Sequence, residues 1–428
     1  MTGILFGSFV VLAIIGLPIA VVLGLSSILA LSTYSKIPLM VVAQRMFTAT
    51  DSFPLMAIPF FMMAGALMET GGISRRLINL ANKIVGGLPG GLALVGIVTC
   101  MFFAAISGSG PATVAAIGSI LIPAMVDAGY DLGFAAAVMA AAGAIGVIIP
   151  PSIPMVTYGV VGGVSIGSIF LGGFGSGIVV GLLLLIVSYV ISKKRGYRGS
   201  EKRSSFIDLL KAIKDAFWAL LMPVIILGGI YGGIFTPTEA AAVAVVYGFL
   251  VGFLIYRELK IKDLPKIFVN TAVSTSVVMF IIATAQVFGW IMTSQRIPEA
   301  IAQGFINLSS NPYVILLLVN ILLLIVGCFM ETNAAIIILA PIFIPLMIKI
   351  GVDPILFGII MVVNLAIGMV TPPLGVNLFV ACGIGKLTLE RISKAVVPFI
   401  LAMVAALLLI TYIPDISMFL PRMLMGGK

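Results

Sequence analysis

Two stretches of this sequence place hydroxyl and amide side chains beside small residues within long apolar segments. They are SGSGPAT, residues 107–113, and METNAA, residues 330–335. Hydroxyl and amide oxygens suit a hard cation such as Na⁺, while the helix expected to begin near Pro111 offers free N–H groups to an anion. The two stretches therefore predict a site for a cation, an anion or both. Close packing of small residues between membrane helices is the alternative interpretation.

Two pairs of adjacent prolines interrupt apolar segments elsewhere in the chain. The first pair lies in GVIIPPS, residues 146–152, and the second in GMVTPPL, residues 368–374. Proline lacks an N–H and clashes with the preceding turn, so each pair should break a helix. Freed carbonyls are tolerated in a membrane only where they line a polar site. With the oxygens of Ser152, Thr371 and Asn377 they would form an oxygen-only cage suited to Na⁺; a plain kink is the alternative.

These features recur at one spacing along the chain. Residues 118–152 match residues 340–374 without a gap when the sequence is shifted by 222 positions. The shift places Pro123 on Pro345, Gly129 on Gly351, Asp131 on Asp353, Gly146 on Gly368, and Pro150 and Pro151 on Pro372 and Pro373. Apolar composition alone does not explain matches of proline, glycine and aspartate in one register. We therefore expect two homologous halves, residues 1–200 and 217–428.

Three charged side chains each allow two interpretations. Glu331 lies in apolar sequence, where a carboxylate is either a functional group or a cap for the next helix. Arg45 either binds a substrate carboxylate through two hydrogen bonds or anchors the chain at the membrane interface. Glu239 resembles a proton carrier, but Thr236 and Pro237 before it complete a helix-capping sequence, so we expect it to be structural.

The composition of the chain requires a membrane. Hydrophobic residues make up 61% of it, charged residues 9%, and the mean hydropathy is +1.27. Long continuous apolar runs indicate helices rather than the alternating strands of a barrel. Histidine is absent from the sequence, which disfavours a metalloenzyme or a histidine proton relay, and the three dispersed cysteines indicate neither a disulfide nor a metal set. The first apolar run has no basic residue before it, so we expect no removable signal peptide.

Charge placement predicts how the two halves are oriented. The basic loops at residues 193–203 and 256–266 are expected on the cytoplasmic side, which accounts for the net charge of +9 without nucleic-acid binding. The expected elements are a re-entrant hairpin over about 88–127, a broken helix over about 132–165, an interfacial amphipathic helix over 201–216, a second hairpin over about 313–349 and a second broken helix over about 354–384. The expected fold is thus an all-α polytopic membrane protein with two inverted-topology repeats, as in alternating-access transporters. The first 35 residues form either one span broken at Pro18 or two short ones.

Five motifs together resemble the large membrane subunit of TRAP transporters, the tripartite ATP-independent periplasmic transporters. They are DSFPLMAIPFF, AAISGSGPATVAAIG, GVIIPPSIPMVTYG, GIFTPTEAAAVAV and GMVTPPLGVNLF. The resemblance implies an elevator transporter of the bacterial inner membrane, with a transport domain of about residues 73–170 and 295–392 and a scaffold formed by the rest. It also implies Na⁺ as the coupling ion and no other cofactor.

The resemblance further implies two protein partners and a class of substrate. The partners are a small four-helix membrane subunit and a periplasmic binding protein, and a small subunit fused before Met1 is not expected. The binding protein would deliver a carboxylate-bearing solute, with C4-dicarboxylates, sialic acid and other sugar or keto acids all open. A single-component Na⁺/dicarboxylate symporter without a binding protein is the alternative. A membrane-embedded enzyme would need a clustered acid, base or metal set that the sequence lacks. A passive channel is disfavoured because the two expected hairpins enter the membrane without crossing it.

The resemblance also assigns site residues to the motifs. Sodium ions are expected at Ser107, Gly108, Gly110, Gly146, Ile149 and Pro150, and at Gly327, Thr332, Asn333, Gly368 and Thr371. The substrate is expected at Arg45, Ser109, Gly110, Pro111, Thr113, Ser152, Glu331, Thr332, Asn333 and Asn377.

Overall fold

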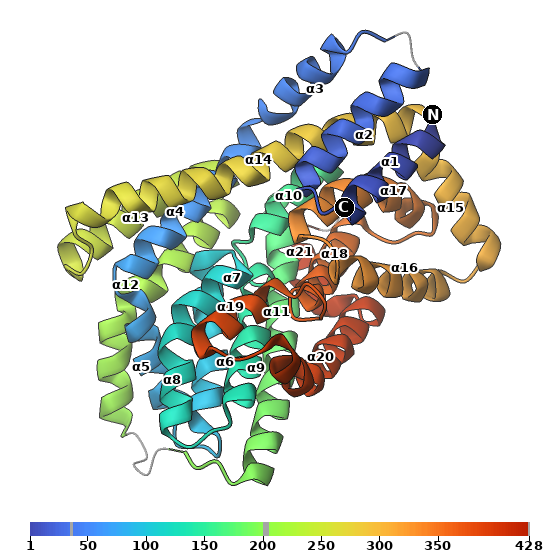
Figure 1. Ribbon diagram of the computed structural model, residues 1–428. Helices are drawn as coiled ribbons and strands as arrows, with labels where there is room; N and C mark the ends of the chain where they lie inside the picture. Colours follow the sequence, from blue (N-terminus) through green and yellow to red (C-terminus); the bar gives the residue numbers. More distant parts are fainter. Residues whose placement is uncertain (35–36, 200–204, 427–428) are drawn as a thin grey trace.

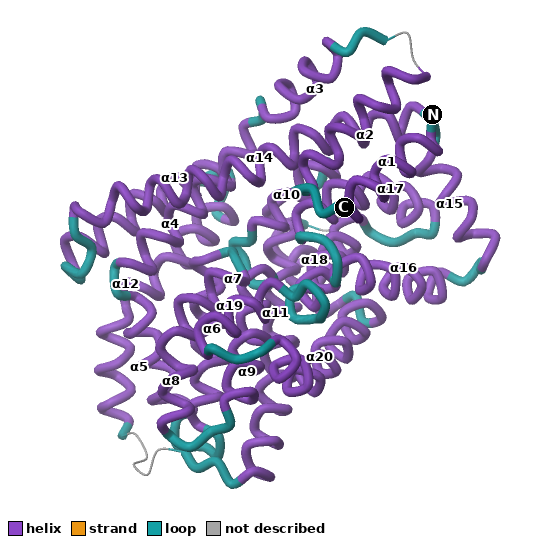
Figure 2. The backbone as a smooth tube through the Cα atoms, viewed as in Figure 1, coloured by secondary structure: helices purple, strands orange, loops and turns teal. Residues whose placement is uncertain are grey.

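The computed structural model describes residues 1–34, 37–199 and 205–426, which form helices and their connections without a strand (Figure 1, Figure 2). Eight helices within these ranges are long and apolar enough to cross a membrane. The expectation of an all-α polytopic membrane protein is confirmed.

The helices follow one another in two series. The first consists of α1 (Thr2–Ile14), α2 (Ile19–Tyr34), α3 (Met40–Thr50), η1 (Phe53–Met56), α4 (Ala57–Thr70), α5 (Ile73–Val85), α6 (Gly91–Ser107), α7 (Gly110–Thr113), η2 (Val114–Gly118), α8 (Ser119–Asp127), α9 (Leu132–Ala144), η3 (Ile145–Val147), α10 (Ile153–Gly162) and α11 (Ile166–Arg195). The second consists of α12 (Phe206–Tyr231), α13 (Pro237–Leu250), η4 (Val251–Ile255), η5 (Ile261–Asp263), α14 (Leu264–Ser294), α15 (Ile297–Leu308), α16 (Pro312–Gly327), α17 (Thr332–Lys349), α18 (Pro354–Gly368), α19 (Val376–Gly385), α20 (Leu389–Tyr412) and α21 (Asp415–Met425).

The N-terminal segment contains two short helices rather than one broken span. α1 and α2 are separated by residues 15–18 and pack against each other (Figure 1). Gly16 between them has a φ of 86°, in the left-handed region that glycine adopts without strain. Pro18 then favours the start of a new helix because it has no N–H to pair. Glycine and proline together therefore decide between the two alternatives left open by the sequence.

The interfacial helix expected over residues 201–216 has no separate counterpart. Residues 201–204 lie outside the described part of the chain, and α12 runs without a break from Phe206 to Tyr231. Ser205 caps this helix in a capping box with Asp208. No glycine or proline precedes Pro223 within α12, so nothing ends the helix after its amphipathic first turns. The amphipathic segment is the beginning of a long helix.

Two helical hairpins and two broken helices form the centre of the molecule. α6 and the α7–α8 segment meet at a tip of residues 107–110, and α16 and α17 meet at a tip of residues 328–331. The paired prolines separate α9 from α10 and α18 from α19, as the sequence predicts. Each hairpin packs on the broken helix of its own half, α6 on α9 and α16 on α18.

The two broken helices run in opposite directions. The start of α9 lies beside the end of α19, since a Cβ atom added to Gly385 would be 3.2 Å from Leu132. At the other end, the Tyr158 hydroxyl of α10 donates to the Pro354 carbonyl at the start of α18, at 2.7 Å. The hairpins therefore enter from opposite ends of the bundle, which confirms the inverted topology.

Helix α14 runs past both hairpins. It packs against α2, α3, α4 and α17 (Figure 1). Its 31 residues give a length of about 46 Å, enough to cross a membrane. The start of α14 overlaps the basic loop at residues 256–266, which is expected on the cytoplasmic side, so its last turns are expected on the outer side.

Candidate functional site

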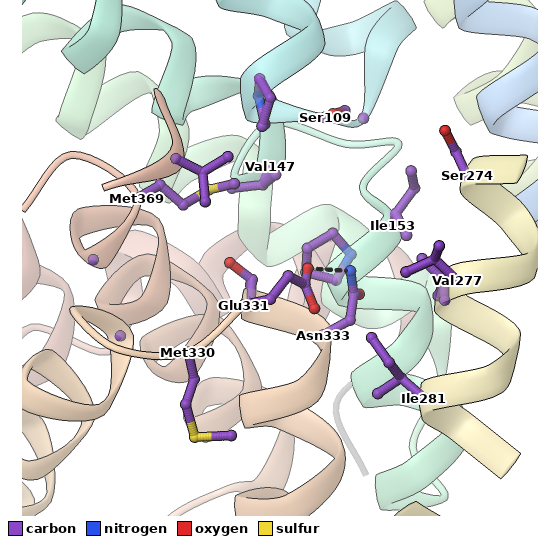
Figure 3. Close-up of a pocket in the computed structure, with 18 of the residues that line it drawn as sticks. Ser109, Val147, Ile153, Ser274, Val277, Ile281, Met330, Glu331, Asn333 and Met369 are labelled. Carbon is purple, nitrogen blue, oxygen red and sulfur yellow. Dashed lines mark hydrogen bonds between the residues drawn. The ribbon is translucent and has the colours of Figure 1, made fainter. Parts of the chain in front are cut away.

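One pocket is enclosed by both hairpin tips, both helix breaks and α14. Its volume is about 330 Å³ (Figure 3). It is lined by Gly108, Ser109 and Pro111 of the first hairpin; Val147, Ile153 and Pro154 of the first break; Gly327, Met330, Glu331, Thr332 and Asn333 of the second hairpin; Gly368, Met369, Leu374, Gly375 and Val376 of the second break; and Met62, Val273, Ser274, Val277, Val278 and Ile281 of α4 and α14. We call it the central pocket.

The tip of the first hairpin is held by hydroxyl groups. Thr113 Oγ1 donates to the Ser109 carbonyl at 2.7 Å and lies 3.0 Å from Ser107 Oγ. Ser107 Oγ also accepts from the Ser109 N–H at 3.2 Å. Gly108 has a φ of 61°, and a Cβ atom there would lie 2.9 Å from the Pro151 carbonyl oxygen. Glycine is therefore needed both for the backbone conformation and for the approach of the first break.

The tip of the second hairpin is held by Glu331. As the N-cap of α17, Glu331 accepts from the Ala334 N–H at 3.0 Å, and its other oxygen accepts from the Asn333 side-chain amide at 2.8 Å. Figure 3 shows Glu331 and Asn333 at the central pocket, opposite Val277 and Ile281 of α14. The capping interpretation of Glu331 is thus confirmed, while the carboxylate also lines the pocket.

At each of the two helix breaks, a glycine lies against the hairpin of the same half. A Cβ atom on Gly146 would lie 2.5 Å from Thr113 Oγ1 and 2.7 Å from the Ser109 carbonyl oxygen, and one on Gly368 would collide with the Gly327 backbone. Pro150–Pro151 and Pro372–Pro373 are both cis peptide bonds. The Thr371 hydroxyl donates to the Ile367 carbonyl at 2.7 Å, which leaves its lone pairs free to accept or to coordinate. Each half thus places a glycine of its helix break against its own hairpin, at Gly146 and at Gly368.

Asn377 connects the second break to the first half. Its amide donates to the Ala140 carbonyl of α9 at 3.1 Å. Its buried Oδ1 atom has no hydrogen-bond partner within the described residues, and a Cβ atom on Gly110 would lie 3.1 Å from it. A buried carbonyl oxygen beside the first hairpin is a suitable ligand for a cation or for a water molecule.

The structure brings most of the predicted residues to one place. Gly108, Ser109, Pro111, Gly327, Glu331, Thr332, Asn333 and Gly368 line the central pocket. Six further predicted residues contact the segments that line the pocket without lining it themselves: Gly110, Thr113, Gly146, Ser152, Thr371 and Asn377. Ser107 lines an adjoining pocket of about 380 Å³, and this pocket shares Ser109 and Ser274 with the central pocket. The adjoining pocket reaches Glu69, at the end of α4 next to α5.

Four predicted residues are placed differently. The Ile149 side chain packs toward Gly177 of α11, and neither it nor Pro150 lines the central pocket, because the chain turns at the break and directs them away. Ser152 is fully buried and donates to the Val147 carbonyl at 2.6 Å, so its hydroxyl shapes the break rather than the pocket wall. Arg45 lies in a separate pocket beside Trp290, because α3 packs on the outer part of α14.

Sequence reasoning missed the wall formed by α14. Ser274 and its apolar neighbours Val277 and Ile281 line the central pocket, and Asn270 and Thr271 line the adjoining one. This helix has no proline pair or glycine cluster at these positions, so its sequence resembles any other membrane span. The polar residues Asn270, Thr271 and Ser274, which fall within about one turn of the helix, are a local signal that could have indicated it.

A helical membrane fold in which two oppositely inserted hairpins enclose one pocket defines the chain as a membrane transporter of the inverted-repeat class. The family model for the DctM component of the tripartite ATP-independent periplasmic transporters matches residues 6–416, and the chain belongs to this family. It is a multi-pass protein of the bacterial inner membrane, and the recognition from its motifs is confirmed.

Similar proteins carry related names. The chain is 53% identical over 416 residues to the isethionate TRAP transporter permease protein DctMQ of Oleidesulfovibrio alaskensis. The aligned region covers 97% of this chain and 66% of that protein. It is 45% identical to the C4-dicarboxylate TRAP transporter large permease protein DctM of Pseudomonas aeruginosa. The aligned region covers 94% of each chain. Among solved structures, the YdaH transporter of Alcanivorax borkumensis has the same fold, with a TM-score of 0.66 and 16% sequence identity. The match covers 89% of this chain and 88% of that one.

Proposed function

We propose that this chain imports a small organic anion together with Na⁺ and that both bind at the central pocket. The observation that carries the proposal is the enclosure of one pocket, largely apolar with a few polar groups, by hairpin tips and helix breaks from both halves. Two elements that come from inverted repeats can exchange roles when the protein alternates between its outward and inward states.

Helix N-termini favour an anionic solute of modest size in this pocket, while the Glu331 carboxylate on its wall would need a bound cation beside it, because no basic side chain among the described residues lines the pocket. The N-terminal end of α17 contributes Thr332 and Asn333, and the first residues of the α7–α8 segment contribute Pro111, so two helix N-termini point to one volume. Two relatives are named for isethionate, which carries a sulfonate, and for C4-dicarboxylates. We therefore extend the expected substrate from carboxylates to small carboxylates and sulfonates.

Oxygen atoms suited to Na⁺ surround both hairpin tips. At the first tip they belong to Ser107, Thr113 and the Ser109 carbonyl, close to Gly146. At the second they belong to Thr371 and to the backbone where Gly327 meets Gly368. Neutral hydroxyl and carbonyl oxygens are ligands of hard cations, so the residues fit Na⁺ as the coupling ion.

The α14 surface fits an elevator mechanism. Its wall of the central pocket consists of Val273, Val277, Val278 and Ile281 with one hydroxyl, Ser274. An apolar wall forms few specific bonds with the hairpin tips and so permits sliding. We propose that residues 73–170 and 295–392 move as a transport domain against a scaffold formed by the rest, with repeats over 1–200 and 217–428.

The proposed partners are a periplasmic binding protein and a small membrane subunit. The family description itself names a tripartite, periplasmic transporter of which this chain corresponds to one component. In the proposed cycle the binding protein delivers the solute at the outer side, while the small subunit extends the scaffold.

Uptake by proteoliposomes tests the proposal. They should contain this chain with its small subunit, and isethionate and a C4-dicarboxylate should be supplied free or on a loaded binding protein, with and without an inward Na⁺ gradient. We expect uptake only with the gradient and the loaded binding protein. Equal uptake of free solute would instead identify a single-component symporter, and uptake that ignores the Na⁺ gradient would exclude Na⁺ coupling.

A further inference from the structure

A third pocket lies at the C-terminal half of α14 and, among the described residues, shares no lining residue with the central pocket. It has a volume of about 280 Å³ and lies between α3, α10, α14 and α17. Arg45, Gln286, Trp290 and Thr293 form its polar side, and Ile337 and Pro341 of α17 form part of its apolar side. None of the residues that line it is acidic. We call it the outer pocket.

Arg45 enters this pocket with its charge unpaired. Its guanidinium carbon lies 4.0 Å from the ring centroid of Trp290, so the indole covers one face of the guanidinium. Its Nε atom is buried without a hydrogen-bond partner in the described part of the chain. No carboxylate within residues 1–34, 37–199 and 205–426 forms an ion pair with it. Arg45 as a whole is half-buried, so the cost of an unpaired buried donor applies to its Nε atom, and a ligand in the pocket would supply the partner that this donor lacks.

We propose that the outer pocket is a second binding site for a small organic anion, with Arg45 as the group that binds its carboxylate or sulfonate. The N–H groups of a guanidinium lie in its plane and point outward from its edge, while Trp290 occupies a face. Stacking on the indole therefore leaves the edge free to bind two oxygens of one anion. Gln286 on the same pocket wall supplies a further amide donor.

The outer pocket adjoins the central pocket along α14. Ile281 lines the central pocket and Ala285 lines the outer one, four residues later. That separation corresponds to about 6 Å along a helix axis. In the transport cycle proposed above, on which this step rests, a solute released at the outer side meets Arg45 before it reaches the hairpin tips.

The competing explanation is that Arg45 only fastens α3 to α14 through its contact with Trp290. A fastening contact needs no ligand, so it predicts no response of Trp290 to organic anions. The chain has two tryptophans, Trp218 and Trp290, so Trp218→Phe leaves Trp290 as a single reporter inside the pocket. Fluorescence of this variant then distinguishes a binding site from a fastening contact.

The experiment uses the full chain in detergent micelles, which add no tryptophan, without sodium. Potassium isethionate and potassium succinate are titrated into the Trp218→Phe protein, with potassium chloride at equal ionic strength as the blank. We expect a saturable change in Trp290 emission with the organic anions alone. Adding Arg45→Gln should abolish it, and adding Arg45→Lys should weaken the apparent affinity by about tenfold because the fork of donors is lost. Thr48→Ala, on the same helix and bonded only to its own helix backbone, should change nothing.

A further variant separates the two pockets. Ser109→Phe fills the central pocket and should leave the Trp290 response intact. A response lost in Ser109→Phe, or retained in Arg45→Gln, would overturn the proposal, as would no response in the parent protein. If Arg45→Gln does not yield a monodisperse protein, the Arg45→Lys titration decides. Because no sodium or gradient is present, the result is independent of whether uptake is coupled to Na⁺.

Discussion

The Thr157 hydroxyl donates a 3.0 Å hydrogen bond to the Asn333 side-chain oxygen and so joins the broken helix of the first half to the hairpin tip of the second. Both side chains are buried. Asn333 in turn donates to Glu331 at 2.8 Å, and Glu331 caps α17. The position of the second hairpin tip therefore depends on a residue of the opposite half, which provides a physical connection between the two sides of the central pocket.

Replacement of Thr157 by valine tests this connection. The variant keeps the shape of the side chain but leaves the buried Asn333 oxygen without its partner, at a cost of about 1–3 kcal/mol. We expect a lower unfolding temperature and weaker solute binding, measured by thermal unfolding with and without solute. Thr157→Ser, which keeps the hydroxyl, should restore both. Unchanged solute binding in Thr157→Val would show that the two halves are coupled by other contacts.

The approach of Gly327 and Gly368 gives a second prediction. A methyl group on Gly368 would collide with the Gly327 backbone, whereas one on Gly383 of α19 would have nothing within 4 Å. Gly368→Ala should therefore displace the second break from its hairpin, with an overpacking cost of about 1–3 kcal/mol, and should strongly reduce uptake in proteoliposomes. Gly383→Ala is the matched control and should transport normally. Equal activity of the two variants would contradict the close approach.

The helix breaks could be predicted from the sequence because proline and glycine affect the backbone at their own positions. Each break contains two adjacent prolines, which remove two successive N–H groups, whereas single prolines such as Pro341 lie inside a continuous helix. The cap at Glu239 is local in the same way, since its carboxylate accepts from the Thr236 N–H at 2.8 Å. The 222-residue repeat then predicted the second copy of each element, and the placement of the basic loops predicted their opposite directions.

The remaining features depend on packing between distant segments, which the sequence does not display. Ser274 and Ile281 line the central pocket only because α14 packs along α17. Ile149 sits next to the predicted break, yet the turn of the chain directs it toward Gly177. Arg45 was predicted at the substrate site, but the course of α3 places it over Trp290. Composition and motif spacing do not determine these directions.

The ion pair between Asp131 and Arg391 gives a prediction about pH. Burial raises the pKa of Asp131, but hydrogen bonds from Arg391 and the Phe134 N–H and the charges of Arg391 and Arg195 together bring it below its ordinary value of 3.8. A carboxyl group whose pKa is lower in the folded than in the unfolded state stabilises the folded state at pH values above its ordinary pKa. This contribution is lost as the pH falls through the pKa of the folded state. Because the side chain is 41% exposed, the effect should be modest and sensitive to salt.

Asp131→Asn isolates this ion pair because asparagine still caps α9. We expect its unfolding temperature to be lower than that of the parent at neutral pH and low salt, and the difference to shrink both at high salt and as the pH falls below the ordinary value. Asp353→Asn at the equivalent cap of α18 is the control, since Asp353 forms no ion pair within the described ranges. A difference that persists unchanged in acid would show that capping, not charge, explains the effect.

Glu239 should matter for stability and not for ion coupling. It completes a capping box at the start of α13, in which the Glu239 N–H donates to Thr236 Oγ1 at 3.3 Å. Glu239→Gln removes the negative charge at the helix N-terminus and should lower the unfolding temperature while the Na⁺ dependence of uptake stays the same. Thr236→Ala removes the other half of the box and should act in the same direction. Loss of ion coupling in well-folded Glu239→Gln would disprove the capping role.

Thr371 provides the sharpest test of the proposed Na⁺ site at the second break. Its hydroxyl proton is committed to the Ile367 carbonyl at 2.7 Å, so its oxygen can offer lone pairs to a cation without competing for that bond. Thr371→Ala should raise the Na⁺ concentration for half-maximal uptake by about tenfold, equivalent to about 1.4 kcal/mol. By reciprocity, Na⁺ should then increase solute affinity by a smaller factor in the variant than in the parent. Thr371→Ser keeps the oxygen and should behave like the parent; if Thr371→Ala does so as well, the second Na⁺ site does not include this side chain.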